Sequence, residues 1–296
     1  MKPRHPAHPY LFLLPAIVTL GVFFVAPLVI AIKNSFYSWD MLTPPRWVGG
    51  ANYAALFRSG EALGILGRTA LYSAIVVAAS LALGLALAVA LDRPGRVYAF
   101  VRGAVFSAYV VSWVAVALLW MWLLDADAGV VGGLVRAFGG APRSWLADPD
   151  RALFAIAIVS VWKITGYAMV IFLAGLQDVP RSVLEAAALD GAGPLRRFTD
   201  VTWPLLRPSA AFVATTALLA SFQAFDVVRV MTQGGPVKAT TLFVYAIYEH
   251  VFVNLRVGRA SALTVVFFVV LLAATALQLL AWRAADRARA TSRGPA

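Results

Sequence analysis

Cysteine is absent from this chain of 296 residues, and charged side chains make up only 13% of it. The absence of cysteine excludes disulfides and thiol chemistry. Soluble globular proteins carry about 25% charged residues, whereas this chain is 61% hydrophobic. The scarcity of charge therefore excludes a soluble globular protein and indicates a membrane protein.

Lysine and histidine are also rare. The lysines are Lys2, Lys33, Lys163 and Lys238, and none of them follows a glycine. A phosphate-binding loop requires Gly-Lys followed by Ser or Thr, so we expect no ATP site in this chain. The three histidines form no cluster with acidic residues at metal-ligand spacing. We therefore expect no metal site, no bound cofactor and no catalytic residues.

Long uncharged runs occupy most of the sequence. A helix needs roughly 20 apolar residues to cross a bilayer core of about 30 Å. Solid apolar blocks of this kind exclude a β-barrel, whose strands alternate over about ten residues. We predict an all-α membrane domain over residues 10–282 with six transmembrane helices. The predicted spans are 10–32, 69–91, 103–124, 152–176, 206–228 and 260–282.

Lysine and arginine are unequally distributed among the segments outside these spans. They are denser in one set of segments, namely 1–9, 92–102, 177–207 and 283–296. The positive-inside rule places this set, and with it both termini, in the cytoplasm. The same rule and contact with anionic lipid account for the net charge of +11, so we expect membrane lipid and no nucleic acid as a partner. The tails are 1–9 and the basic segment 283–296.

The loop 177–205 is longer than a connection between two spans requires. Pro180 suits the first turn of a helix, and Ser182 with Glu185 fits the capping-box pattern. The residues from Ala186 onward are good helix formers. Glu185 could serve only its own helix in an interfacial elbow, or the loop could be a surface for a soluble partner.

A glycine break follows this predicted helix. Gly191 and Gly193 permit a left-handed turn, and Pro194 can begin a second short helix. Pro204 then stands at the head of the next apolar run. The loop therefore predicts two short ordered helices rather than a flexible linker.

This loop resembles the EAA loop in the permease subunits of binding-protein-dependent ABC importers. Three pieces match that family pattern in order and spacing: Glu185-Ala186-Ala187, Asp190-Gly191-Ala192 and Pro204. Trp203 stands where the family usually has Leu. The resemblance covers nearly the whole chain, because Leu14-Pro15-Ala16 and the segment 47–53 also resemble carbohydrate permeases of the maltose and glycerol-phosphate class.

The resemblance implies the type I ABC-importer permease architecture, with a cytoplasmic coupling helix, in the cytoplasmic (inner) membrane. It implies that Glu185 pairs with a basic group of a separate ATPase subunit, which binds the ATP and magnesium. The implied coupling residues are Glu185, Ala186, Ala187, Asp190, Gly191 and Pro204. The implied partners are a second homologous permease in a heterodimer, two ATPase subunits, an extracytoplasmic solute-binding protein and a carbohydrate solute.

Lys163 lies near the middle of the fourth predicted span, where an ionised lysine costs roughly 2.5–3.5 kcal/mol. It either lines the translocation path, where it could pair with Asp226, or it bonds to a helix carbonyl. Sugars are bound by hydrogen-bonding side chains and aromatic rings, although aromatic residues are also ordinary in membrane helices. The candidate path residues are Trp162, Lys163, Tyr167, Phe222, Gln223, Phe225 and Asp226.

The connections on the outer side are too long for simple turns. The resemblance implies that they receive the solute-binding protein, and irregular capping loops are the alternative. The candidate contacts are Asn52, Tyr53, Gly234, Gly235 and Pro236.

Two other functions stay open from the sequence. A permease with the same loop could import an amino acid, a polyamine or a phosphate ester. An intramembrane enzyme would need a catalytic constellation, and Lys163 and Asp226 are its charged candidates, without a Ser or His partner by motif.

Overall fold

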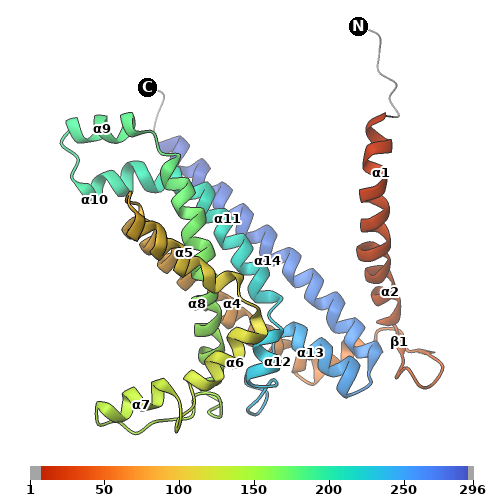
Figure 1. The fold of residues 1–296 in the computed structure, drawn as a ribbon. Coiled ribbons are helices and arrows are strands. Elements are labelled where there is room, and N and C mark those ends of the chain that lie inside the picture. Colours follow the sequence, from red (N-terminus) through yellow and green to blue (C-terminus); the bar gives the residue numbers. More distant parts are fainter. Residues whose placement is uncertain (1–7, 293–296) are drawn as a thin grey trace. The chain divides into compact units, whose positions relative to one another are not determined.

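A computed structural model describes residues 8–292, which form two compact units. The first unit comprises 8–64 and 246–270, and the second comprises 65–245 and 271–292. Within these residues, five helices are long and apolar enough to cross a membrane, and a sharply bent helix pair makes a sixth crossing if it counts as one span. Helices dominate (Figure 1), because a bilayer offers no water to pair with free backbone groups.

The first unit combines a membrane span with small extramembrane elements. The elements of this unit are α1 (His8–Leu20), the π-helical turn η1 (Gly21–Val25), α2 (Ala26–Asn34), β1 (Tyr37–Ser38), β2 (Arg46–Trp47), α3 (Ala51–Arg58), the π-helical turn η3 (Glu249–Val253) and the start of α14 (Val257–Ser292). The two strands pair antiparallel, with Tyr37 opposite Trp47.

A close approach of β1 to α14 fixes this unit. The backbone N–H of Val257 donates to the carbonyl of Trp39 at 2.9 Å. A Cβ atom on Gly258 would overlap the carbonyl oxygen of Tyr37, so glycine is required there. Asn52, which is 8% exposed, donates from Nδ2 to the same Tyr37 carbonyl at 2.9 Å. The segment after the first span is therefore fixed against the first turn of α14.

The second unit contains most of the remaining helices. Its elements are α4 (Glu61–Leu91, after its first turn), α5 (Arg96–Val110), α6 (Trp113–Leu123), α7 (Val130–Ala137), α8 (Ala152–Gln177), α9 (Arg181–Leu189), α10 (Pro194–Arg197), the π-helical turn η2 (Phe198–Thr202), α11 (Trp203–Phe222), α12 (Asp226–Met231) and the later part of α14. Helix α13 (Phe243–Tyr248) leads back in sequence to the first unit.

Helix α8 is the centre of the second unit. Within its apolar window 72% of the residues are buried, whereas none are in the first span, Phe12–Asn34. Met169 and Phe172 of α8 pack against Ala210 and Val213 of α11 in the core. Protein atoms therefore surround α8 on most sides, and a polar side chain on it can find protein partners.

Two predicted spans differ from the helices that form. The predicted span 103–124 is divided at Val111 and Ser112, where α5 and α6 meet at a bend of 102°. The predicted span 206–228 is interrupted after Phe222, and α12 begins at Asp226. Asp226 suits the start of α12, because an acidic residue is favourable at a helix N-terminus. The breaks at 111–112 and 223–225 contain no proline or glycine, so the sequence gives no sign of either break.

The predicted tails fall partly outside the described residues. Residues 1–7 of the predicted tail 1–9 and residues 293–296 of the predicted tail 283–296 are outside that range. Helix α14 continues through 283–292, so this stretch extends the last span as helix.

Gly166 lets α8 lie directly against α5. A Cβ atom at Gly166 would overlap the backbone of Val105 and Phe106. Gly166→Ala should therefore separate the two helices and lower the free energy of unfolding by about 1–3 kcal/mol, the usual cost of overpacking. Thermal unfolding in detergent measures this loss. Gly103→Ala on α5 is the matched control, because a Cβ there meets open space; equal melting temperatures for the two variants would contradict the prediction.

Candidate functional site

The bend between α5 and α6 frees backbone carbonyl groups at membrane depth. Lys163 of α8, which is 2% exposed, donates from Nζ to the carbonyls of Ala108 and Tyr109 at 3.1 and 2.9 Å. It also donates to the carbonyl of Val111. Each unsatisfied backbone group in lipid costs several kcal/mol, so one ammonium group supplies the donors for three carbonyls of the broken span.

Aromatic rings complete the surroundings of this ammonium group. Its Nζ lies 5.0 Å from the ring centroid of Trp113 and 5.8 Å from that of Tyr109, within the range of cation–π attraction. Tyr167 stacks on Tyr109 with centroids 4.8 Å apart. Among residues 8–292 Lys163 has no carboxylate partner, Asp226 included. This geometry is that of a lysine bonded to helix carbonyls.

A cavity of about 210 Å³ lies where α11 ends and α12 begins, and Trp113 forms part of its wall. Gln223 is exposed and Asp226 half-buried, so an amide and a carboxylate are both available at the cavity. The residues that line it are Trp113, Ala220, Gln223, Ala224, Phe225, Asp226 and Val227. Hydrogen-bonding groups beside aromatic rings suit a polyhydroxylated solute. Within the described range, no three His, Asp or Glu side chains come together as metal ligands would.

Four of the predicted path residues do not line this cavity: Lys163 and Tyr167, which lie at the α5–α6 bend, and Trp162 and Phe222. Trp162 is 42% exposed and meets Trp120 edge-on at 5.8 Å, beside a separate apolar cavity between α4, α5 and α8. Phe222 is buried and stacks with Phe243 at 6.5 Å. The structure therefore brings together at the small cavity only part of the predicted set: Gln223, Phe225 and Asp226.

Trp113 was not among the predicted path residues. It lines the cavity because the α5–α6 bend places it at the first position of α6. The sequence around the bend, Val110-Val111-Ser112, carries no helix-breaking signal. The unpaired lysine in an apolar run was the available clue, because such a group requires acceptors from another element.

The predicted outer contacts divide between the two units. In the first unit Tyr53 donates from its hydroxyl to Ser35 Oγ at 2.7 Å, and Asn52 is bonded to β1 as described above. In the second unit Gly234 has φ +79°, and Thr241 Oγ1 donates to its carbonyl at 3.1 Å. Each set is held by its own hydrogen bonds.

Helix α9 ends in a Schellman cap at Gly191. The φ of Gly191 is +77°, which glycine adopts without a Cβ penalty. Its N–H donates to the Ala188 carbonyl at 3.1 Å, and the N–H of Ala192 donates to the Ala187 carbonyl at 3.0 Å, the pattern that defines this cap. The left-handed turn predicted at Gly191 is present.

Two predicted details of the loop are wrong. Gly193 has φ −66° and is the N-cap of α10, so it makes no left-handed turn. Helix α9 begins at Arg181 with Pro180 as N-cap and without a side-chain cap hydrogen bond. Ser182 is already inside the helix, so it cannot form the predicted capping box with Glu185.

The helices α9 and α10 present an unusual surface. Leu189 is 89% exposed and Leu195 is 77% exposed. Glu185 is exposed, and in the described part of the chain it has neither a hydrogen bond nor an ion pair. Figure 1 shows α9 and α10 at one end of the second unit, opposite α7 and α12. This end offers apolar and acidic groups without partners of their own.

Comparison with known proteins identifies what the chain resembles. The family model described as "Binding-protein-dependent transport system inner membrane component" matches residues 80–285. The sn-glycerol-3-phosphate transport system permease protein UgpA of Agrobacterium fabrum is 34% identical over 272 residues, which cover 91% of this chain and 92% of the relative.

Solved structures share the fold. A chain of a bacterial ABC transporter involved in the import of the acidic polysaccharide alginate matches with a TM-score of 0.79 and 22% identity, over 93% of this chain and 94% of that one. A bacterial alginate transporter in complex with a periplasmic protein that holds an alginate pentasaccharide matches with a TM-score of 0.78 and 21% identity, over 91% of each chain.

Lys163→Met should leave three carbonyl groups at the α5–α6 bend without their hydrogen-bond donor. Hydrogen bonds to charged groups contribute about 1.5–3 kcal/mol each, so we expect the free energy of unfolding to fall by about 3 kcal/mol or more. Thermal unfolding of the purified protein in detergent measures the loss. Lys163→Arg should retain most of the stability, and Trp162→Phe is the neighbouring control. Full stability of Lys163→Met combined with loss of uptake would instead place this lysine on the solute path.

Proposed function

Because this chain belongs to the family of binding-protein-dependent transport system inner membrane components, we propose that it is the permease subunit of an ATP-driven importer and that its loop 177–205 couples it to the ATPase. It is a multi-pass inner-membrane protein. It has the all-α, six-span architecture of a type I ABC-importer permease, as predicted from the sequence.

The observation that carries the coupling role is the surface of α9 and α10, where Leu189 and Leu195 are exposed and Glu185 has no partner in the described part of the chain. Docking on a soluble subunit would bury Leu189 and Leu195, and each such side chain contributes roughly 1.5–3 kcal/mol. Glu185 would pair with a basic group of that subunit, and Ala186 and Ala187 would permit close approach. The Schellman cap at Gly191 keeps the two helices in one arrangement, so a displacement of the ATPase would move α8 and α11 as rigid elements.

The other subunits follow from what this chain lacks. ATP and magnesium would be bound by two partner ATPase subunits, and this chain would bind no cofactor and catalyse no reaction. A second, homologous permease would cover exposed spans such as Phe12–Asn34, none of which is buried within the described chain. The loop must face the ATPases, so both termini would lie in the cytoplasm.

The solute would be a carbohydrate or a related polyol derivative. The relatives are named for sn-glycerol-3-phosphate and for alginate, and one alginate transporter was solved with its periplasmic protein. A solute-binding protein would deliver the solute and contact the segments around Asn52–Tyr53 and Gly234–Pro236. The cavity at the α11–α12 break would then receive the solute. Gln223 and Asp226 would form hydrogen bonds with its hydroxyl groups, and Phe225 would stack on its sugar ring.

Glu185→Lys and Gly191→Pro should each abolish ATP-driven uptake without affecting membrane insertion. The first places like charges at the proposed contact, and the second removes the left-handed turn. Uptake of labelled sugars and sugar phosphates into whole cells measures coupling. Purification in mild detergent with mass spectrometry of the bound proteins then measures whether the ATPase and a second permease are retained.

Arg181→Gln is the control for these variants, because Arg181 is exposed on the same helix and lies outside the motif. It should keep both uptake and the ATPase. Normal uptake in a chain carrying both Glu185→Lys and Gly191→Pro would refute the coupling role. Recovery of the unaltered chain without any ATPase would refute the proposal that it is a subunit of an ATP-driven importer.

Gln223→Ala should raise the apparent KM for the solute by about two- to tenfold, because a neutral hydrogen bond contributes about 0.5–1.5 kcal/mol. The maximal rate should change little, since the coupling loop is untouched. Transport kinetics in proteoliposomes separate the two constants. Trp162→Phe, outside this cavity, should alter neither, and an unchanged KM for Gln223→Ala would exclude the cavity from the solute path.

A further inference from the structure

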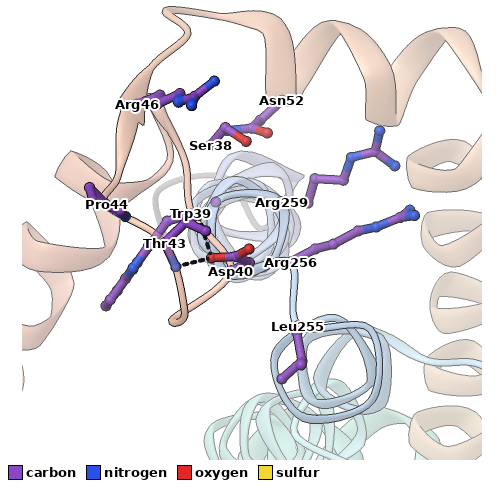
Figure 2. Close-up of a pocket in the computed structure, with 11 residues that line it drawn as sticks. Ser38, Trp39, Asp40, Thr43, Pro44, Arg46, Asn52, Leu255, Arg256 and Arg259 are labelled. Atoms are coloured by element: carbon purple, nitrogen blue, oxygen red, sulfur yellow. Dashed lines mark hydrogen bonds between the residues drawn. The ribbon is translucent and has the colours of Figure 1, made fainter.

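The first unit contains a polar pocket of about 510 Å³, and the arginines of this pocket have no role in the function proposed above. Its walls come from the segment around β1 and β2 and from the start of α14 (Figure 2). The residues that line it are Ser38, Trp39, Asp40, Thr43, Pro44, Arg46, Asn52, Leu255, Arg256, Gly258 and Arg259. Three of these are arginines and one is an acid, so the pocket is basic.

Within the described part of the chain, the side chains of the pocket arginines have no partner. Among residues 8–292, Arg46, Arg256 and Arg259 form neither an ion pair nor a hydrogen bond through their side chains. Figure 2 shows the side chains of Arg256 and Arg259 extending in the same direction from the start of α14. Guanidinium groups bind phosphate and carboxylate through paired N–H bonds, so these groups offer a site for an oxyanion.

The acidic residue of the pocket is engaged in its own turn. Asp40 Oδ1 accepts hydrogen bonds from the backbone N–H and the hydroxyl of Thr43 at 2.7 and 2.8 Å, and from the N–H of Leu42 at 3.0 Å. These bonds, the Thr43 backbone bond foremost, lower the pKa of Asp40. The carboxylate is therefore ionised at neutral pH, yet a single negative charge leaves the pocket with an excess of positive charge.

The backbone walls of the pocket are held by contacts within the protein. Asn52 and Gly258 fix its two walls through the Tyr37 carbonyl, as described for the fold. A ligand would therefore bind without first ordering the backbone, which removes a major cost of association.

The position of the pocket indicates which oxyanion it meets. Helix α2 ends at Asn34 and α14 begins at Val257, so the pocket lies where two membrane spans end. The neighbouring side chains Leu42 and Trp47 are 79% and 66% exposed, and exposed tryptophan is typical of the membrane–water boundary. Phospholipid phosphates lie at this depth.

We propose that the pocket lined by Arg46, Arg256 and Arg259 binds the phosphate group of an anionic phospholipid headgroup. The arginines hold the phosphate oxygens, and the exposed apolar side chains beside the pocket lie against the glycerol and acyl part of the lipid. A free phosphate offers the same charge without the apolar part. The proposal depends on neither the coupling loop nor the identity of the solute.

Native mass spectrometry of the purified chain, with the subunits that co-purify, tests this site. The protein is reconstituted in phosphatidylcholine nanodiscs with or without phosphatidylglycerol, and the retained phosphatidylglycerol is counted. A basic group near a membrane surface is worth about fivefold in affinity, so Arg256→Gln combined with Arg259→Gln should weaken retention by about 25-fold. Arg58→Gln, exposed on α3 of the same unit and outside the pocket, should retain the lipid like the unaltered chain.

Further experiments distinguish a lipid phosphate from free phosphate and from a protein carboxylate. Arg256→Lys combined with Arg259→Lys keeps the charge and should keep most of the binding, which distinguishes a lost contact from a misfolded protein. Equal retention of phosphatidylglycerol by the unaltered chain and the double glutamine variant would overturn the proposal. So would thermal stabilisation by inorganic phosphate that equals the stabilisation by phosphatidylglycerol. Protection of the arginines from phenylglyoxal only by the solute-binding protein would assign the pocket to a protein carboxylate instead.

Discussion

Every backbone carbonyl inside a bilayer needs a donor, and at the α5–α6 bend that donor is the ammonium group of Lys163. Much of the second unit depends on this constraint. The bend places Trp113 beside the cavity at the α11–α12 break, and the lysine requires α8 to lie at the centre of the unit, away from lipid. A charge that would be costly by itself is thereby matched to a broken helix that would be equally costly by itself. Removing either partner leaves the other unsatisfied.

The loop of α9 and α10 differs from the α5–α6 bend, because it does not depend on a donor from a distant helix. Its backbone groups are satisfied locally, through the Schellman cap at Gly191 and the proline start of α10, and its side chains contribute little to the packing of the unit. Leu189 and Leu195 remain exposed although both are apolar. A segment whose backbone is held by its own hydrogen bonds and whose apolar side chains are exposed can be displaced as a body and can still bind a second protein.

The features that could be predicted from the sequence are those with local causes. Apolar run length predicted the membrane-spanning character, and Gly191, Pro194 and Pro204 marked the turn and the helix starts of the loop 177–205. The bend at residues 111–112 has no local cause, because its stabilising group lies about fifty positions along the chain. The same holds for the arginine pocket, because Arg46 of β2 lines it together with Arg256 and Arg259, which are far away in the sequence. The predicted path residues Gln223 and Asp226 line one cavity, whereas Trp162, equally plausible by composition, lies at a different cavity.

The bond between Lys163 and the bend also bears on biogenesis. The carbonyl acceptors are on residues 108–111 and the donor is on residue 163, so a ribosome completes the acceptors first. Chains emerge N-terminus first at about 5–20 residues per second. The bend is therefore synthesised a few seconds before Lys163. During that interval the open carbonyls need water, a headgroup or the insertion machinery as a temporary donor. The carbonyls of the bend obtain their permanent donor only when the helix that carries Lys163 packs against them.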